Sequence, residues 1–412
     1  MDVVVARCAG LDVHRDTVVA TVRTPAGKGR RRHQDTRTFT TTQTRLAELA
    51  GWLGEHGVTL VGMEATGVYW KPVFYALEDR FECWLLNAQH LHNVPGRKTD
   101  VADSAWICQL VEHGLVRPSF VPPPEIRRLR DLTRLRKSQI DERTRAVQRL
   151  EKVMQDAGIK LTSVASQAYS KSARAMLEAL LAGVTDPAAL AELAKARLRS
   201  KIPELREAMA NRFQVDHHGA LVAQLLAHID VLDEAVAALD ARVIQQCVPF
   251  ADIIELVDTI PGVARRTAEA LVAECGIDMT RFATAGHLAS WAGICPGNNA
   301  SGGKRRSGHT RPGSRWLRQA LTEAAWAVAR SKGTYFSSHH AQILGRRGKT
   351  KALGATRHDL LVAYYHVVRD RVPFQDLGAD WLARRYSVEH RTARLVRQLE
   401  ALGHTVTLQS VN

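Results

Sequence analysis

The sequence contains no uninterrupted apolar run that approaches the roughly 20 residues needed to cross a bilayer. Its first ten residues are too short and too quickly interrupted by charge for a secretory signal. Its six cysteines stand singly, and no two of them form a C-x-x-C pair. This spacing argues against a zinc site and against a disulfide framework. We therefore expect a cytoplasmic protein with reduced, mostly buried thiols and no membrane partner.

Basic residues are in clear excess. Lysine and arginine outnumber aspartate and glutamate by 57 to 42, which gives a formal net charge of +15 at pH 7. Most of the excess is arginine, whose planar fork suits phosphate groups, so the charge favours nucleic acid as the partner. At 412 residues the chain also exceeds what one hydrophobic core usually organises, and two or three domains are expected.

The first hundred or so residues predict an α/β domain. Period-two alternation indicates strands at residues 3–12, 18–23 and 37–42, and short apolar segments indicate two more at 59–64 and 82–86. Helical patterns fall at 45–56, 69–78 and 100–113. The order βββαβαβα matches an RNase H-like domain, which we assign to residues 1–118.

A triple proline at residues 122–124 marks a domain boundary, because proline cannot lie inside a helix or a central strand. A helical region, 119–250, follows. One long helix is expected at 127–154, with ten lysines and arginines, and another at 220–243. The second has coiled-coil spacing at Leu225, Ile229, Leu232, Val236, Leu239 and Val243. That seam fits self-association or an intramolecular helical hairpin equally well.

The remainder predicts a mostly helical domain, 251–376, and a tail, 377–412, whose role the sequence does not indicate. Two helices flank Pro261-Gly262, a loop rich in Gly, Asn, Ser and Arg spans 296–315, and helices are expected at 316–331 and 353–369. The paired histidines at 217–218 and 339–340 are interpreted as polar surface or core residues, because no further Cys or His completes a metal site.

Four acidic residues are candidates for a metal site. Asp12 and Glu64 end predicted strands, while Asp100 and Asp103 share one face in the first turn of a predicted helix. Such a cluster suits two-metal phosphodiester chemistry, because Mg²⁺ takes few protein oxygens and leaves positions open for a phosphate. Taken singly, each acid also fits an ordinary turn, strand end or helix cap.

A flexible loop offers a candidate nucleophile. Ser301 lies in a Gly- and Asn-rich segment beside Lys304, Arg305 and Arg306, cations that would neutralise a phosphate. A serine in such a loop is usually only a turn residue, and Ser307 competes for the role. The base that would activate the hydroxyl must come from elsewhere.

Two further segments are candidates for binding nucleic acid. Residues around Gly262 look like a helix-hairpin-helix, whose turn offers backbone N–H groups to a phosphate, with Arg265 and Arg266 nearby. Ala264 stands where glycine is usual, so a purely structural turn is the alternative. A basic tract with neighbouring aromatic residues suits phosphate contacts and base stacking, or is a solvated loop beside the core. It comprises Arg305, Arg306, Arg311, Arg315 and Arg318.

Three acidic motifs carry a family resemblance. The segments GLDVH at 10–14, EATGVY at 64–69 and KTDVAD at 98–103 resemble, in order and spacing, those of the DEDD transposases of the IS110 family of insertion sequences. Residues 288–318 are similar to that family's C-terminal transposase motif. The resemblance implies a RuvC-like N-terminal domain whose metal ligands are Asp12, Glu64, Asp100 and Asp103, with Lys98 at the edge of the site. It also implies that Ser301 is a nucleophile that forms a covalent link to DNA.

The same resemblance implies the partners: double-stranded DNA of the element ends and the target, a structured guide RNA, and a homo-oligomer, dimer or tetramer, in a bacterial cell. The metal would be Mg²⁺ or Mn²⁺. The basic helix 127–152 and the turn 27–32 are plausible backbone contacts, or solvated charge. Two alternatives stay open: a junction nuclease that uses water with the same carboxylates, and a non-catalytic nucleic-acid-binding protein.

Overall fold

The computed structural model describes residues 2–26, 32–65, 67–86, 102–165, 169–297, 299–307, 310–384 and 388–409. The chain divides into two compact units, Met1–Pro122 and Pro123–Asn412. The division falls inside the triple proline, a few residues after the boundary expected at 118. Among the described helices, none combines the length and apolarity that crossing a bilayer requires.

The N-terminal unit has an RNase H-like fold. Its sheet has the strand order β3-β2-β1-β4-β5. The first three strands are antiparallel neighbours, whereas β4 runs parallel to β1 and β5 parallel to β4. The strands are β1 (Cys8–Val13), β2 (Thr17–Thr24), β3 (His33–Thr40), β4 (Leu60–Glu64) and β5 (Glu82–Leu86). The strands and helices follow one another along the chain as the sequence pattern predicted, βββαβαβα.

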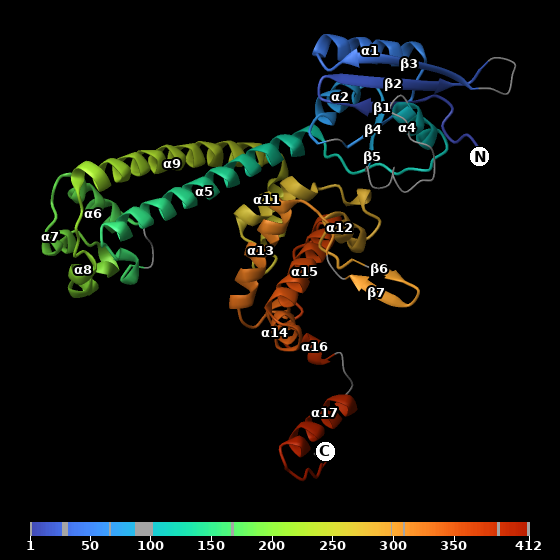
Figure 1. Cartoon of the computed structure of the whole chain (residues 1–412). Helices are drawn as coiled ribbons and strands as arrows, with labels where there is room; N and C mark the ends of the chain where they lie inside the picture. The colour runs from blue at the N-terminus through green and yellow to red at the C-terminus, as the bar shows by residue number, and fades with distance from the viewer. Residues whose placement is uncertain are drawn as a thin grey trace. The chain divides into compact units, whose positions relative to one another are not determined.

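Helices cover both faces of this sheet (Figure 1). On one face, Leu11 and Val13 of β1 pack with α1 (Gln43–Glu55) and α2 (Trp70–Leu77) in one buried cluster. On the other face, Cys8 and Leu60 pack with α4 (Ala102–Glu112). Successive strand residues alternate between these two faces, so the parity of a position decides which helix it meets.

A long helical hairpin opens the second unit. It is formed by α5 (Pro124–Asp156) and α9 (Ala220–Gln246). Ion pairs link Arg136 to Asp240 and Arg143 to Asp233, so residue numbers rise along one helix as they fall along the other, and the two are antiparallel. The predicted seam therefore faces α5 of the same chain, and self-association remains a prediction. Pro124 is the first residue of α5, where its missing N–H is not needed, so the triple proline does not lie wholly outside the helix.

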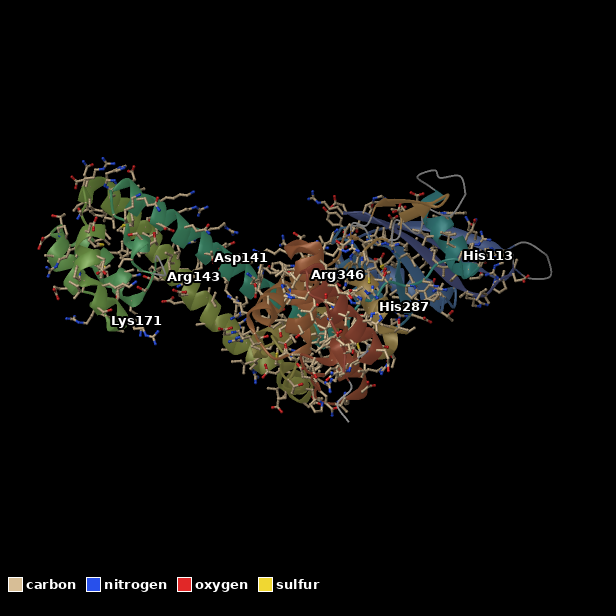
Figure 2. The ribbon with its side chains drawn as sticks, turned by 90° about the horizontal axis from the view of Figure 1, so that it is seen from below. His113, Asp141, Arg143, Lys171, His287 and Arg346 are labelled. Carbon is tan, nitrogen blue, oxygen red and sulfur yellow. The ribbon has the colours of Figure 1, made fainter. Side chains whose placement is uncertain are left out.

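A small subdomain, residues 157–219, joins the far ends of α5 and α9 and was not predicted. It contains α6 (Lys171–Leu181), α7 (Pro187–Glu192) and α8 (Ile202–Ala208), with short helical turns at Leu161–Ser163, Ala196–Lys201 and Val215–Gly219. Its core, which includes Met176, Leu190 and Leu205, continues into the adjoining ends of the hairpin. Figure 2 labels Asp141 and Arg143 on the hairpin and Lys171 on this distal subdomain.

The rest of the second unit is a helical domain with one small β-hairpin. The helices are α10 (Ala251–Asp258), α11 (Arg265–Cys275), α12 (Ala285–Trp291), α13 (Arg315–Arg330), α14 (Tyr335–Arg347), α15 (Lys349–Asp370), α16 (Trp381–Arg384) and α17 (Val388–Ala401). Short 3₁₀ turns lie at Val248–Phe250 and Met279–Arg281. Helix α15 is central, because its buried Tyr364 and Tyr365 donate to the carbonyls of Gly276 and Phe282 at 2.7 and 3.0 Å. Helices α12 and α14 and the two tail helices were missed by the sequence analysis.

One ion pair of this domain should make its stability depend on pH. His339 on α14 contacts Asp359 on α15 at 2.6 Å, and this hydrogen bond raises the pKa of His339 above its usual 6.5. Because the folded protein holds this proton more tightly than the unfolded chain, the protonated histidine adds to the free energy of unfolding. The contribution is complete when the pH is below the pKa of the unfolded state, and it is lost as the pH rises through the pKa of the folded state. The substitution His339→Gln should therefore lower the free energy of unfolding most at about pH 6 and less at about pH 8.5.

Urea denaturation of the wild type and the variant at several pH values measures this difference. Burial lowers the pKa of the neighbouring His340, which gives an opposite trend, but that trend is largely shared by both proteins. The control is His366→Gln on α15, where the contact with Asp370 is longer, 3.8 Å, and exposed. A cost of His339→Gln that stays constant with pH would contradict the prediction.

Candidate active site

Two of the predicted metal ligands lie on one face of the sheet. Strands β1 and β4 pair in parallel with Leu11 opposite Met63, so Asp12 and Glu64 follow at matching positions. Each lies two residues after a glycine that faces α4, Gly10 and Gly62. By strand periodicity both carboxylates therefore point to the α4 side, at the carboxyl ends of adjacent strands. Asp12 is 9% exposed, and Glu64 is half-buried.

Helix α4 brings a third acid to this edge. The backbone of α4 lies directly on β1, because a Cβ built on Gly10 would be 2.2 Å from the carbonyl oxygen of Ser104. Farther along, the Sγ atoms of Cys108 and Cys8 are 3.7 Å apart. The helix therefore runs opposite to β1, and its first turn, with Asp103, lies over the end of the strand that holds Asp12. Buried Ser104 and Thr21, whose hydroxyls are 2.8 Å apart, fix that turn to the sheet.

Two predicted residues of this cluster, Asp100 and Lys98, lie outside the described residues. The exposed His14 contacts Asp12, with 3.2 Å between Nε2 and Oδ2. The acids present offer only oxygen ligands on a partly enclosed edge, which is the donor set that Mg²⁺ or Mn²⁺ prefers. The residues therefore fit a divalent metal.

The predicted nucleophile lies on a β-hairpin where the sequence predicted a loop. Strand β6 (Asn299–Ser301) pairs with β7 (Lys304–Ser307), and Ser301 lies opposite Lys304. The intervening Gly302 and Gly303 both have positive φ, +56° and +75°, which two-residue hairpin turns of type I′ require. Residues 299–307 are called the serine hairpin below. Ser301 thus immediately precedes its turn, and Lys304, Arg305 and Arg306 form the returning strand.

The base of the serine hairpin is closed by backbone contacts. Pro296 and Thr310 form an isolated β-bridge between the two arms. Below it, a Cβ on Gly313 would lie 2.1 Å from the carbonyl oxygen of Ala292, so the two arms cross in direct backbone contact. The arms leave from α12 and enter α13. The hairpin is therefore held at a defined place on the helical domain.

A buried carboxylate ties this base to α5. Ser314, the N-cap of α13, donates its hydroxyl to Glu274 at 2.7 Å and accepts from the backbone of Leu317. Arg134 of α5 donates to both oxygens of Glu274 at 2.6 and 2.8 Å. Neighbouring Arg130 donates to the last carbonyls of α11, those of Ala273 and Glu274. The hairpin base, α11 and the long helix thus share one ionic network.

Removing Arg134 should destabilise the second unit. Glu274 is 3% exposed, so Arg134→Met leaves a buried carboxylate with weaker compensation and should cost about 2 kcal/mol. The matched control is Arg143→Met on the same helix, whose partner Asp233 is 45% exposed and whose loss should cost less than about 0.5 kcal/mol. Urea denaturation followed by circular dichroism measures both. Equal costs for the two variants would contradict the network's importance.

The residues of the predicted helix-hairpin-helix make packing contacts and ion pairs with other parts of the same unit. Helices α10 and α11 flank Pro261-Gly262 as predicted, but a Cβ on Gly262 would lie 2.8 Å from the carbonyl oxygen of Ala324 on α13. Arg265 pairs with the buried Glu269, and Arg266 pairs with Glu269 and Asp240. Packing and internal ion pairs therefore account for these residues, and their contact with DNA remains a prediction.

The other predicted cations are distributed around the serine hairpin. Arg311 is exposed on the returning arm, and Arg315 stacks on Trp316 with 4.4 Å to the ring centroid. Arg318, half-buried on α13, donates to the carbonyl of Arg311 at 3.3 Å. In the N-terminal unit, Arg32 of the predicted basic turn pairs with the fully buried Glu112, so its role there is structural.

The histidine pair at 217–218 has an acidic neighbour. His217 and His218 lie beside Asp156, with ligand atoms within 4.8 Å of one another, so an aspartate that the sequence analysis did not consider completes a three-residue group. The backbone N–H of Gln214 donates to Nδ1 of His218, which leaves the proton of a neutral ring on Nε2, 3.2 Å from Asp156. A metal at Nε2 would displace that proton. The group is therefore better explained as a clasp that holds the turn Val215–Gly219, which precedes α9, against the end of α5.

Two family models match the chain. One, described as a transposase of the DEDD type of IS110, covers residues 9–159, with β1, β4 and α4. The other, described as the transposase family of IS116, IS110 and IS902, covers residues 254–341, with the serine hairpin. The chain belongs to the IS110 family of transposases. Both candidate sites of this transposase lie in the matched segments, the acids in the first and the serine hairpin in the second.

Several known proteins resemble this IS110-family transposase. An uncharacterized 43.6 kDa protein of insertion element IS110 from Streptomyces coelicolor is 30% identical over 42% of this chain and 45% of its own length. A probable family 20 transposase from Pseudomonas aeruginosa is 25% identical over 70% and 76%. A pilin gene-inverting protein from Moraxella lacunata is 31% identical over 34% and 45%. The matched stretch thus spans less than half of the first and third relatives.

Among solved structures, RuvC of Thermus thermophilus matches with a TM-score of 0.22 and 12% identity, covering 27% of this transposase and 99% of that chain. The assignment of the RNase H-like fold rests on the strand order and directions of the sheet.

Proposed function

We propose that this IS110-family transposase cuts and rejoins DNA strands with Ser301 as nucleophile, while Asp12, Glu64, Asp100 and Asp103 bind Mg²⁺ or Mn²⁺. The observation that carries the proposal is the register of β1 and β4, which brings Asp12 and Glu64 to one edge under the first turn of α4. When bound there, the metal would neutralise a scissile phosphate and lower the proton affinity of an attacking hydroxyl.

The attack by serine replaces one phosphorus–oxygen ester bond with another. A new bond forms between Oγ of Ser301 and the phosphorus, and the bond from phosphorus to a deoxyribose oxygen breaks. The serine proton passes to a base at the site, and the released sugar oxygen takes up a proton. Lys304, Arg305 and Arg306 on the returning strand neutralise the phosphate during the attack. Because the phosphodiester is exchanged and not hydrolysed, the reverse step rejoins strands without an energy source.

The relatives support recombination over simple cutting. One is named a pilin gene-inverting protein, and inverting a DNA segment requires every cut strand to be rejoined. A second is named a probable transposase. We further propose double-stranded DNA, a structured guide RNA and further copies of this chain as partners, with the carboxylates of one subunit meeting the serine hairpin of another.

The experiment looks for the covalent adduct. Purified protein with its co-purifying RNA is incubated with element-end and target DNA and Mg²⁺, and the products are separated on a denaturing gel. Wild type should form a protein–DNA adduct, Ser301→Ala should form none, and the control Ser307→Ala should keep it. Strand cutting without an adduct, equal in Ser301→Ala, would replace this proposal with a nuclease that uses water.

A further inference from the structure

Arg318 and Arg357 of the helical domain are neighbours, and the hydrogen-bond partners of their side chains are uncharged. Arg357 of α15 donates Nη1 to Oγ1 of Thr322 at 3.4 Å, and that hydroxyl donates to the carbonyl of Arg318 at 2.6 Å. The side chain of Arg318 donates to the carbonyl of Arg311. Among the described residues, the hydrogen bonds of both guanidinium groups thus end on hydroxyl or carbonyl oxygens, which carry no full charge.

No internal acid balances this pair within the described part of the second unit. Every aspartate and glutamate of residues 123–412 lies among the described residues, yet the charge that acts most on Arg357 is that of Arg318. The Nε atom of Arg357 is buried and has no hydrogen-bond partner among the described residues. Burial, and then the charge of Arg318, lower the pKa of Arg357.

Such an arrangement is costly without an anion. A guanidinium stays charged at any ordinary pH, so neither residue escapes the repulsion by losing its proton. Burying a charged group is unfavourable unless an opposite charge or good hydrogen bonds compensate. An occupant with a negative charge and several acceptor oxygens would satisfy the buried Nε and screen the two cations at once.

We propose that Arg318 and Arg357 together bind one backbone phosphate of the nucleic acid held at the serine hairpin. The location supports this ligand, because Arg311, whose carbonyl holds Arg318, follows the Pro296–Thr310 bridge at the hairpin base. The inference rests on the proposed function, since it assumes nucleic acid at that hairpin. Arg357 lies outside residues 254–341, the segment that matches the family.

The first test is the salt dependence of binding. Full-length wild type, Arg357→Gln and Arg318→Gln are titrated with a DNA duplex and with an RNA duplex of the same sequence at several salt concentrations. Losing one phosphate contact should lower the slope of log K against log salt by about one, equally on unrelated sequences. The control is Arg369→Gln on the same helix, which removes the same charge from an exposed pair with Asp370.

The outcomes separate the possible ligands. A smaller slope on DNA alone assigns a DNA phosphate, and one on RNA alone assigns a guide-RNA phosphate; both support the site. Slopes that match those of Arg369→Gln on both duplexes overturn it. The double variant of Arg318 and Arg357 should lose no more slope than either single variant, because the two residues hold one phosphate.

Inorganic phosphate provides a second readout that needs no nucleic acid. At constant ionic strength, phosphate should raise the unfolding midpoint of the wild type and of Arg369→Gln more than that of Arg357→Gln. In phosphate-free buffer, Arg357→Gln should be at least as stable as the wild type, because one of two like charges is gone. If Arg357→Gln were less stable than the wild type in phosphate-free buffer, and if phosphate stabilised both proteins equally, the role of Arg357 would be purely structural.

The binding measurements and the covalent-adduct assay of Ser301 can fail independently of each other. If no covalent adduct forms but the slopes change as expected, the nucleophile is wrong and the phosphate site is retained. If the adduct forms and the slopes do not change, the proposed function holds and this inference fails.

Discussion

Replacing Asp12 by asparagine should lower the rate of strand cleavage by on the order of 10³-fold or more at saturating Mg²⁺. Asp12 is 9% exposed at the carboxyl end of β1, where the register places it beside Glu64 and below the first turn of α4. An amide of the same size keeps the packing but removes the negative charge that a divalent metal requires. The loss should therefore appear in catalysis and not in folding.

A matched variant separates the site from its surroundings. Asp16→Asn removes the same charge four residues later, from a carboxylate that is 80% exposed and paired only loosely with Arg15. It should cleave at close to the wild-type rate. Single-turnover cleavage across a range of Mg²⁺ concentrations measures both variants. Near-normal cleavage by Asp12→Asn would remove Asp12 from the metal site.

Replacing Gly10 by alanine should destabilise the N-terminal unit by about 3 kcal/mol, the upper end for overpacking, because a clash with backbone atoms cannot be relieved by a rotamer change. The new Cβ would lie 2.2 Å from the carbonyl oxygen of Ser104 and 2.3 Å from the backbone nitrogen of Cys108. Helix α4 must then move away from β1. Because the first turn of α4 carries Asp103, strand cleavage should fall with stability.

Hydrogen exchange of the amides of β1 measures this local cost, with α15 of the other unit as an internal reference. The control is Gly51→Ala in α1, where an added Cβ meets no atom within 4 Å. There alanine should be neutral or stabilise the helix by about 0.5–1 kcal/mol. If Gly10→Ala exchanged like Gly51→Ala, the direct backbone contact between α4 and β1 would be wrong.

Local periodicity predicted the sheet well because each strand carries its own pattern. The presence of the five strands and their succession along the chain followed from alternation and from short apolar segments. The start of β1 did not: residues 3–7 also alternate, but Val4 is 69% exposed, and the N–H groups of Val4 and Val5 donate to the carbonyl of Glu112. An extended segment has the same period as a strand, and only its pairing partner distinguishes the two.

The serine hairpin was missed although its turn signal was present. Gly302-Gly303 is a dipeptide that two-residue hairpins favour. The flanking strands are only three and four residues long, and the charged Lys304, Arg305 and Arg306 show no apolar alternation. With so little pattern on either side, glycine predicts a loop as readily as a turn.

Contacts between distant residues could not be predicted at all. Arg318 and Arg357 are 39 positions apart, and only the packing of α13 against α15 brings them together. The same holds for Arg134 and Glu274, and for Asp156 and His218. Charge patterns in a single sequence show which residues are ionic. They do not show whether a cation ends beside an acid, as Arg265 does, or beside another cation.

The distal subdomain enters and leaves the hairpin at nearly the same place. The N–H of Arg212 donates to the carbonyl of Ala157 at 2.9 Å, and Lys160 donates to Ala208 at 2.8 Å, so the chain returns to where it departed. An insertion with adjacent ends costs the parent structure little, since a short turn can close the same gap. Residues 160–253 also lie between the two segments that match the family. Residues 160–211 can therefore be exchanged for a fluorescent or targeting domain without breaking the connection between α5 and α9, provided that the apolar hairpin residues they cover, such as Leu150 and Leu226, are replaced by polar ones.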